Sequence, residues 1–130
     1  MYKPALTAGA LIAMLSVILG AFGAHGLRGL LSPEQFLVYT TAVTYQFYHS
    51  FGLLITGILY KSFPYRNLRL STTFFITGIV FFSGSLYAMN VLSLQGASLG
   101  PVGVLTPIGG LFFILGWLFL LLGILKKQVA

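Results

Sequence analysis

Long apolar segments separated by short polar stretches dominate the pattern along the chain. About 20 helical residues cross the hydrocarbon core of a bilayer, so each segment is long enough to form a transmembrane helix. The pattern therefore predicts an all-α protein, a transmembrane four-helix bundle, made of a single membrane domain over residues 1–130. The four expected spans cover approximately residues 4–25, 33–60, 70–90 and 105–125.

Local signals indicate where some of these helices begin and end. Ser32 is a good N-cap, Pro33 suits the first helical turn, and Gln35 completes a capping box with Ser32. The stretch from Asn90 to Gly103 is polar and contains glycine, which predicts a loop before the fourth helix. Pro107 is then expected in the first turn of that helix, where proline is tolerated.

The composition indicates that this helical protein lies in a membrane. The chain is 58% hydrophobic and only 6% charged, whereas an ordinary soluble domain has about 25% charged residues. Lipid must therefore be the solvent for most of the chain. The remaining segments are as apolar as the first and need packing partners, so we expect the first segment to be a retained span and not a cleaved signal peptide.

The charged residues indicate the orientation of the chain. The net charge is +6, yet the basic residues fall in short clusters between apolar segments, which is typical of membrane topology and excludes a nucleic-acid partner. With alternating spans, one side carries Lys3, Lys61, Arg66, Arg69, Lys126 and Lys127. The other side carries a single basic residue, Arg28, with Glu34 nearby. The positive-inside rule therefore predicts that both termini are cytoplasmic.

Small residues recur at helical spacing within the spans. Lipid provides no hydrophobic drive for helix association, so such residues permit the close approach that packing in a membrane requires. The expected helix-packing residues are Gly9, Ala13, Gly20, Ala24, Gly84, Gly109, Gly116 and Gly123. Trp117 lies near the middle of the fourth span, where packing in the protein core is its expected role.

Polar side chains at membrane depth form the candidate site. Under the predicted topology, polar or glycine-rich positions from all four spans converge on the outer half of the bundle. The candidate polar cluster consists of His25, Gln46, His49, Ser83, Ser85, Tyr87 and Thr106. Such residues either form hydrogen bonds between helices or line a functional cavity, and both interpretations stay open. His49, halfway along the second span, is the member with the strongest claim to more than packing. His25 is either a candidate lid or entry residue of an outer-facing site, or simply the polar end of the first helix.

The sequence lacks the residues that most catalytic or cofactor sites need. Glu34 is the only carboxylate and there is no cysteine, so paired-carboxylate catalysis, a carboxylate-rich metal site and thiolate chemistry are excluded. A serine–histidine nucleophile would have no aspartate to orient its base. His25 and His49 differ in expected depth by roughly 13 Å, too far to share a haem. We expect no enzyme activity, no cofactor and no metal.

Four motifs occur in an order that resembles a known family. They are GAFGAHGL at residues 20–27, YQFYH at 45–49, FSGSLY at 82–87 and TPIGGLFFILGW at 106–117. Together they closely resemble the small bacterial membrane proteins grouped as domain of unknown function 423, or uncharacterised protein family 0382, and vertebrate transmembrane protein 256 looks like a relative. The resemblance implies a multi-pass protein of the bacterial cell membrane. It implies no established activity, substrate or cofactor.

Three hypotheses for function follow. The first is a non-enzymatic membrane protein that acts through self-association or membrane-protein partners, with the lipid bilayer as its surroundings. The second is a small-solute or ion transporter or channel that uses the polar cluster around His49. The third is a module that binds a cofactor or lipid.

Overall fold

Four long helices make up almost all of the computed structural model, which describes residues 1–127. They are α1 (Lys3–Phe22), α2 (Pro33–Leu59), α3 (Arg66–Leu94) and α4 (Val102–Leu125). A single turn of π-helix, η1 (Gly23–Leu27), continues α1. Residues 1–127 contain no strand, so the predicted all-α class is confirmed.

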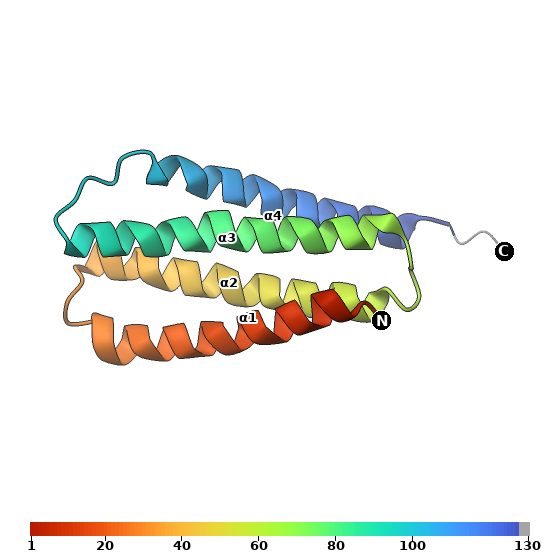
Figure 1. Ribbon diagram of the computed structural model, residues 1–130, viewed down its shortest axis with the longest axis horizontal. Helices are drawn as coiled ribbons and strands as arrows, with labels where there is room; N and C mark the ends of the chain where they lie inside the picture. Colours follow the sequence, from red (N-terminus) through yellow and green to blue (C-terminus); the bar gives the residue numbers. More distant parts are fainter. Residues whose placement is uncertain (128–130) are drawn as a thin grey trace.

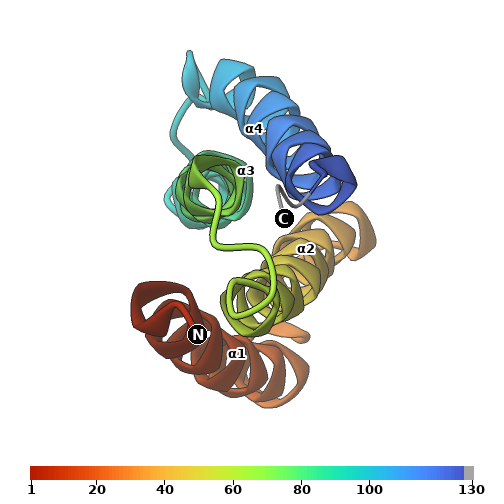
Figure 2. The same ribbon diagram turned by 90° about the vertical axis from the view of Figure 1, so that its right-hand side faces the viewer.

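The helices run alternately up and down and form an open array (Figure 1). Each helix packs mainly on its neighbours in sequence, α1 on α2, α2 on α3 and α3 on α4, and α4 also touches α2. Seen from the end, α1 and α4 lie at opposite ends of the array (Figure 2). One side of α2, between α1 and α4, is consequently left without a covering helix.

Three of the four helices are long and apolar enough to cross a membrane. These are α1 with η1 (Lys3–Leu27), α3 and α4. Within the described residues, α2 is long enough at 27 residues but is less apolar than these three helices. Its buried face explains the difference, because Gln46, His49 and Ser50 point toward neighbouring helices and lower its mean hydropathy.

The start of α2 agrees with the sequence prediction. The Gln35 backbone N–H donates to Ser32 Oγ at 3.2 Å, and the Ser32 N–H donates to Gln35 Oε1 at 2.9 Å. The capping box is therefore confirmed, and it satisfies two N–H groups that the helix itself leaves unpaired.

The predicted loop from Asn90 to Gly103 is wrong over its first part. Helix α3 continues through Leu94, because Asn90 is buried against the helix and donates from Nδ2 to the Leu86 carbonyl at 3.1 Å. The helix ends where Gly96 takes a positive φ of 66°, a left-handed conformation that favours glycine.

The predicted position of Pro107 is also wrong. Helix α4 already begins at Val102, so Pro107 lies inside the helix and not in its first turn. A proline ring inside a helix crowds the carbonyl four residues earlier and removes that carbonyl's hydrogen bond. Here the carbonyl belongs to Gly103, a residue without a side chain.

The expected packing glycines differ in how closely other helices approach them. A Cβ added at Gly9 would lie 2.9 Å from the Ser50 carbonyl oxygen, and one at Gly109 would overlap the backbone of Phe82. Gly116 and Gly123 meet side chains of α3 just as closely. The remaining expected positions are looser: Gly20 has 3.6 Å to Val43, Gly84 has open space, Ala13 is half-buried and Ala24 is exposed.

Close approach also occurs at glycines that sequence reasoning did not single out. A Cβ at Gly57 would lie 2.7 Å from Leu6, and one at Gly78 or Gly23 would overlap Phe113 or Tyr39. The tightest contacts of α1 with α2 and of α3 with α4 therefore use glycines from both members of each pair.

Candidate functional site

Gln46 joins three helices near the middle of α2. Its Oε1 accepts a hydrogen bond of 2.7 Å from the Tyr87 hydroxyl of α3, and its Nε2 donates to the Ile12 carbonyl of α1 at 3.4 Å. Tyr87 also packs against Tyr39, with ring centroids 5.6 Å apart. The Tyr39 hydroxyl donates to the Leu19 carbonyl, which ties α2 to α1 a second time.

The serines of α3 make two further links. Ser83 Oγ donates to the Ala42 carbonyl of α2 at 2.7 Å. Ser85 Oγ and Thr106 Oγ1 lie 2.6 Å apart and share a hydrogen bond between α3 and α4. Since α3 lies between α2 and α4, Ser83 and Ser85 face different neighbours and do not open into one common space.

His49 uses both ring nitrogens, one toward α4 and the other toward the backbone of its own helix α2. Trp117 Nε1–H donates to His49 Nε2 at 3.1 Å, and His49 Nδ1 lies 2.7 Å from the Tyr45 carbonyl oxygen. An indole nitrogen only donates, so Nε2 must be the bare acceptor and Nδ1 must carry the proton. The ring also stacks on Phe113, with centroids 3.5 Å apart and planes 7° from parallel. His49 is therefore a neutral imidazole of defined tautomer.

Trp117 is the residue of this site that sequence reasoning missed. The expectation that it packs in the core is wrong, because 43% of its surface is exposed while its N–H reaches inward to His49. No sequence pattern links the two residues, because the facing sides of α2 and α4 depend on how each helix is rotated about its axis.

His25 lies apart from the other members of the predicted polar cluster. It is exposed in η1, beyond the end of α1, whereas the remaining six are hydrogen-bonded between helices. Those six form separate pairs: Gln46 with Tyr87, Ser85 with Thr106, and His49 and Ser83 each with a group outside the predicted set.

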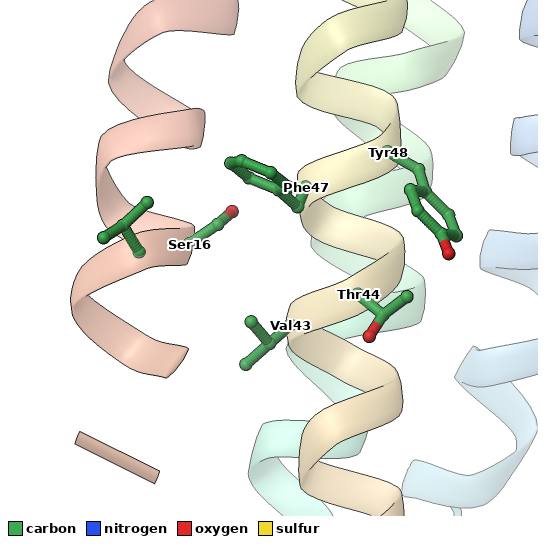
Figure 3. Close-up of a pocket in the computed structure, with 6 residues that line it drawn as sticks. Ser16, Val43, Thr44, Phe47 and Tyr48 are labelled. Carbon is green, nitrogen blue, oxygen red and sulfur yellow. The ribbon is translucent and has the colours of Figure 1, made fainter. Parts of the chain in front are cut away.

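Two open grooves flank the outward side of α2. One lies between α1 and α2, has a volume of about 350 Å³ and is lined by Ser16, Val17, Val43, Thr44, Phe47 and Tyr48 (Figure 3). The other lies between α2 and α4, has a volume of about 680 Å³ and includes Tyr45, His49 and Trp117. Residues 1–127 hold no group of three or more side chains that could ligate a metal ion.

These features place the chain in the class of helical membrane proteins. A small all-helical chain carries its polar side chains between helices and its apolar side chains outward, which is the arrangement expected in a bilayer.

The particular family follows from comparison with known proteins. The family described as a protein of unknown function, DUF423, matches residues 19–110, and the chain belongs to it. The predicted family resemblance is confirmed.

Named relatives agree with the class over most of the chain. A UPF0382 membrane protein of Staphylococcus haemolyticus is 44% identical over 118 residues, which cover 91% of this chain and 92% of the relative. One from Staphylococcus saprophyticus is 45% identical over 91% of this chain and 93% of its own. The UPF0382 membrane protein YwdK of Bacillus subtilis is 37% identical over 91% and 93% of the two chains. No solved structure matches the chain.

Proposed function

We propose that the protein is a four-span protein of the bacterial cell membrane that has no enzymatic activity and acts by associating with itself or with other membrane proteins. The observation that carries this proposal is the pairing of its interior polar groups. Gln46, His49 and Ser85 each have their hydrogen-bonding groups engaged by a neighbouring helix or their own backbone. Groups used in this way hold the helices together, which leaves the outer surface to perform the function.

The location of α2 supports its assignment as a membrane span in addition to α1, α3 and α4. It runs beside α1 and α3, antiparallel to both (Figure 1), and its buried polar residues Gln46 and His49 bond to neighbouring helices. Polar groups that face other helices do not meet lipid, so α2 tolerates a lower mean hydropathy than a helix surrounded by lipid.

The distribution of charge supports the proposed orientation. The start of α1, the α2–α3 connection and the end of α4 lie at one end of the array (Figure 1). This end carries Lys3, Lys61, Arg66, Arg69, Lys126 and Lys127. Arg28 and Glu34 lie at the other end, so the positive-inside rule favours cytoplasmic termini.

Association is tested by isolating the protein with its surrounding lipid in polymer nanodiscs and measuring its mass by native mass spectrometry. We expect an oligomer or a defined complex with another membrane protein. A strictly monomeric and partner-free protein would contradict the proposal.

A transporter or channel is the competing proposal, and the groove between α2 and α4 favours it because His49 borders that groove at membrane depth. The chain has no native cysteine, so single cysteines at Gln46, His49 and Ser85 report individually. Labelling of these positions by water-soluble maleimides from outside would support a hydrated path. If all three stay protected and His49→Ala changes no flux in proteoliposomes, this alternative is excluded.

A further inference from the structure

The outward side of α2 carries a stripe of side chains that no helix covers. Leu37, Thr41, Thr44, Tyr48, Phe51, Ile55 and Ile58 follow one another at alternating intervals of four and three residues, as in the contact seam of paired helices. The apolar members and Tyr48 are exposed, with Tyr48 58% exposed. We call this set the α2 stripe.

Two hydroxyl groups in the α2 stripe have no hydrogen-bond partner among residues 1–127. Thr41 donates to the Leu37 carbonyl of its own helix at 2.8 Å, but the hydroxyls of Thr44 and Tyr48 make no such bond. Figure 3 shows Thr44 and Tyr48 on one side of α2, with the Tyr48 hydroxyl directed back toward the level of Thr44. Their neighbour Phe47 points instead toward α1.

These hydroxyls lie too deep to reach water. Tyr48 is about 11 residues from the nearer end of α2, or roughly 16 Å along the helix axis. Exposure to lipid at this depth leaves a hydroxyl unpaired where no water is available, which is unfavourable in free energy. The α2 stripe therefore requires a partner that offers hydrogen bonds at the middle of the membrane.

We infer that the α2 stripe is a self-association surface on which a second copy of this chain docks its own α2. Two copies in one membrane share their orientation, so a two-fold axis along the membrane normal places the two α2 helices in parallel. Residues of equal depth then meet, and Thr44 and Tyr48 face their own counterparts.

The chemistry of the stripe is self-complementary. A hydroxyl both donates and accepts, so Thr44 and Tyr48 satisfy the same residues of the second copy. The stripe contains no charged residue, so like charges do not oppose the contact. The two flanking grooves, of about 350 and 680 Å³, offer space for large side chains of the second copy. This inference rests on the proposed function and specifies which surface performs it.

Disulfide cross-linking in native membranes tests the surface. Single cysteines at Thr44, Phe51 and Ile55 should form disulfide-linked dimers on mild oxidation, because each meets its own copy across the axis. The controls are Met14→Cys on α1 and Val80→Cys on α3, which are 54% and 62% exposed and lie near the middle of their helices. These controls should remain monomeric.

A second measurement tests the hydroxyls separately from the fold. Tyr48→Phe and Thr44→Val keep the size of the side chain and should weaken dimerisation by roughly threefold to tenfold, since each contact occurs twice. Thr41→Val is the matched control, because its hydroxyl is already bonded within α2, and it should leave the dimer unchanged. Dimerisation is measured by energy transfer between labelled copies in liposomes.

The outcomes separate this inference from the proposed function. Cross-links at the control positions but not at the stripe, or a stripe cross-linked to a different protein, would overturn the inference while leaving association intact. A monomeric and partner-free protein would overturn both. Equal dimerisation of Tyr48→Phe, Thr44→Val and the parent would overturn the role of the hydroxyls.

Discussion

His49 is held on both edges and on one face of its ring, and this combination fixes its state. The indole N–H of Trp117 needs an acceptor at Nε2, while the Tyr45 carbonyl needs a donor at Nδ1. Protonation of Nε2 would place two N–H groups against each other. The histidine therefore acts as a link between α2 and α4 that works only in its neutral form.

The His49–Trp117 link is measurable by a double-mutant cycle. Trp117→Phe and His49→Phe should each lower the free energy of unfolding, and the coupling between them should be about 0.6 kcal/mol, the average for hydrogen bonds between membrane helices. The measurement is reversible unfolding in mixed micelles of each single variant and of the double variant. Strict additivity would mean that the hydrogen bond adds nothing to stability.

Asn90 differs from His49, because one polar atom of its buried side chain has no hydrogen bond among the described residues. It is 4% exposed, and its Oδ1 has no hydrogen-bond partner within residues 1–127. An unpaired buried acceptor costs about 1–3 kcal/mol in folding free energy.

Asn90→Leu should leave the free energy of unfolding unchanged or raise it by about 1 kcal/mol, because the unpaired acceptor is removed and the side-chain volume is kept. Ser83→Ala is the comparison, since it removes a hydrogen bond to the Ala42 carbonyl and should lower stability. Both variants are compared with the parent by unfolding in mixed micelles. A marked loss of stability in Asn90→Leu would show that Oδ1 has a partner in the membrane.

At the scale of helices, contact between α3 and α4 depends on where glycines meet large side chains. Gly109 faces the backbone of Phe82, Gly116 faces Phe75, and Gly78 on α3 faces Phe113. Gly116 and Gly78 receive a ring of the facing helix and Gly109 receives its backbone, which allows close approach without a hydrophobic drive. Regular glycine spacing alone does not distinguish such positions, because Gly84 borders open space.

The pair Gly109→Ala and Gly84→Ala tests this distinction. A methyl group at Gly109 would overlap the Phe82 backbone, so we expect a loss of about 1–3 kcal/mol in unfolding free energy. The same change at Gly84 should be neutral or slightly stabilising, because alanine favours a helix more than glycine does. Equal effects at both positions would contradict the packing described for α3 and α4.

At the scale of the whole molecule, the open array separates an interior from two kinds of outer surface. Most of α1 and α4 presents apolar side chains, whereas the middle of α2 presents hydroxyls as well. Six of the seven basic residues lie at one end of the array, away from both surfaces, and Arg28 lies at the other end (Figure 1). We therefore expect charge to set the orientation, and we propose that the surface of α2 mediates association.

The orientation leads to a labelling prediction. Ser98→Cys, in the connection between α3 and α4, should react with a membrane-impermeant maleimide in intact cells, because this connection lies at the end that carries few basic residues. Ser62→Cys, between α2 and α3, should react only after the membrane is permeabilised. Reversed labelling would show that the termini are outside.

The sequence by itself determined the helical class, the start of α2 and the end at which each charge lies. These features depend on local composition, on hydrogen bonds between residues three apart, such as Ser32 and Gln35, and on alternation of direction along the chain. Where local signals competed, sequence reasoning failed: it ended α3 at Asn90 although that side chain bonds within the helix, and it began α4 too late.

Only the tertiary structure decided which polar groups meet and which surface stays open. Helix α4 is apolar all round, so its sequence does not indicate which side faces inward. Close contacts such as Gly109 against Phe82 set the rotation of the helix, and that rotation brings Trp117 to His49. The same packing turns Gln46 toward Tyr87. Tyr48 lies on the opposite side of α2 and faces the membrane, because no neighbouring helix packs on that side.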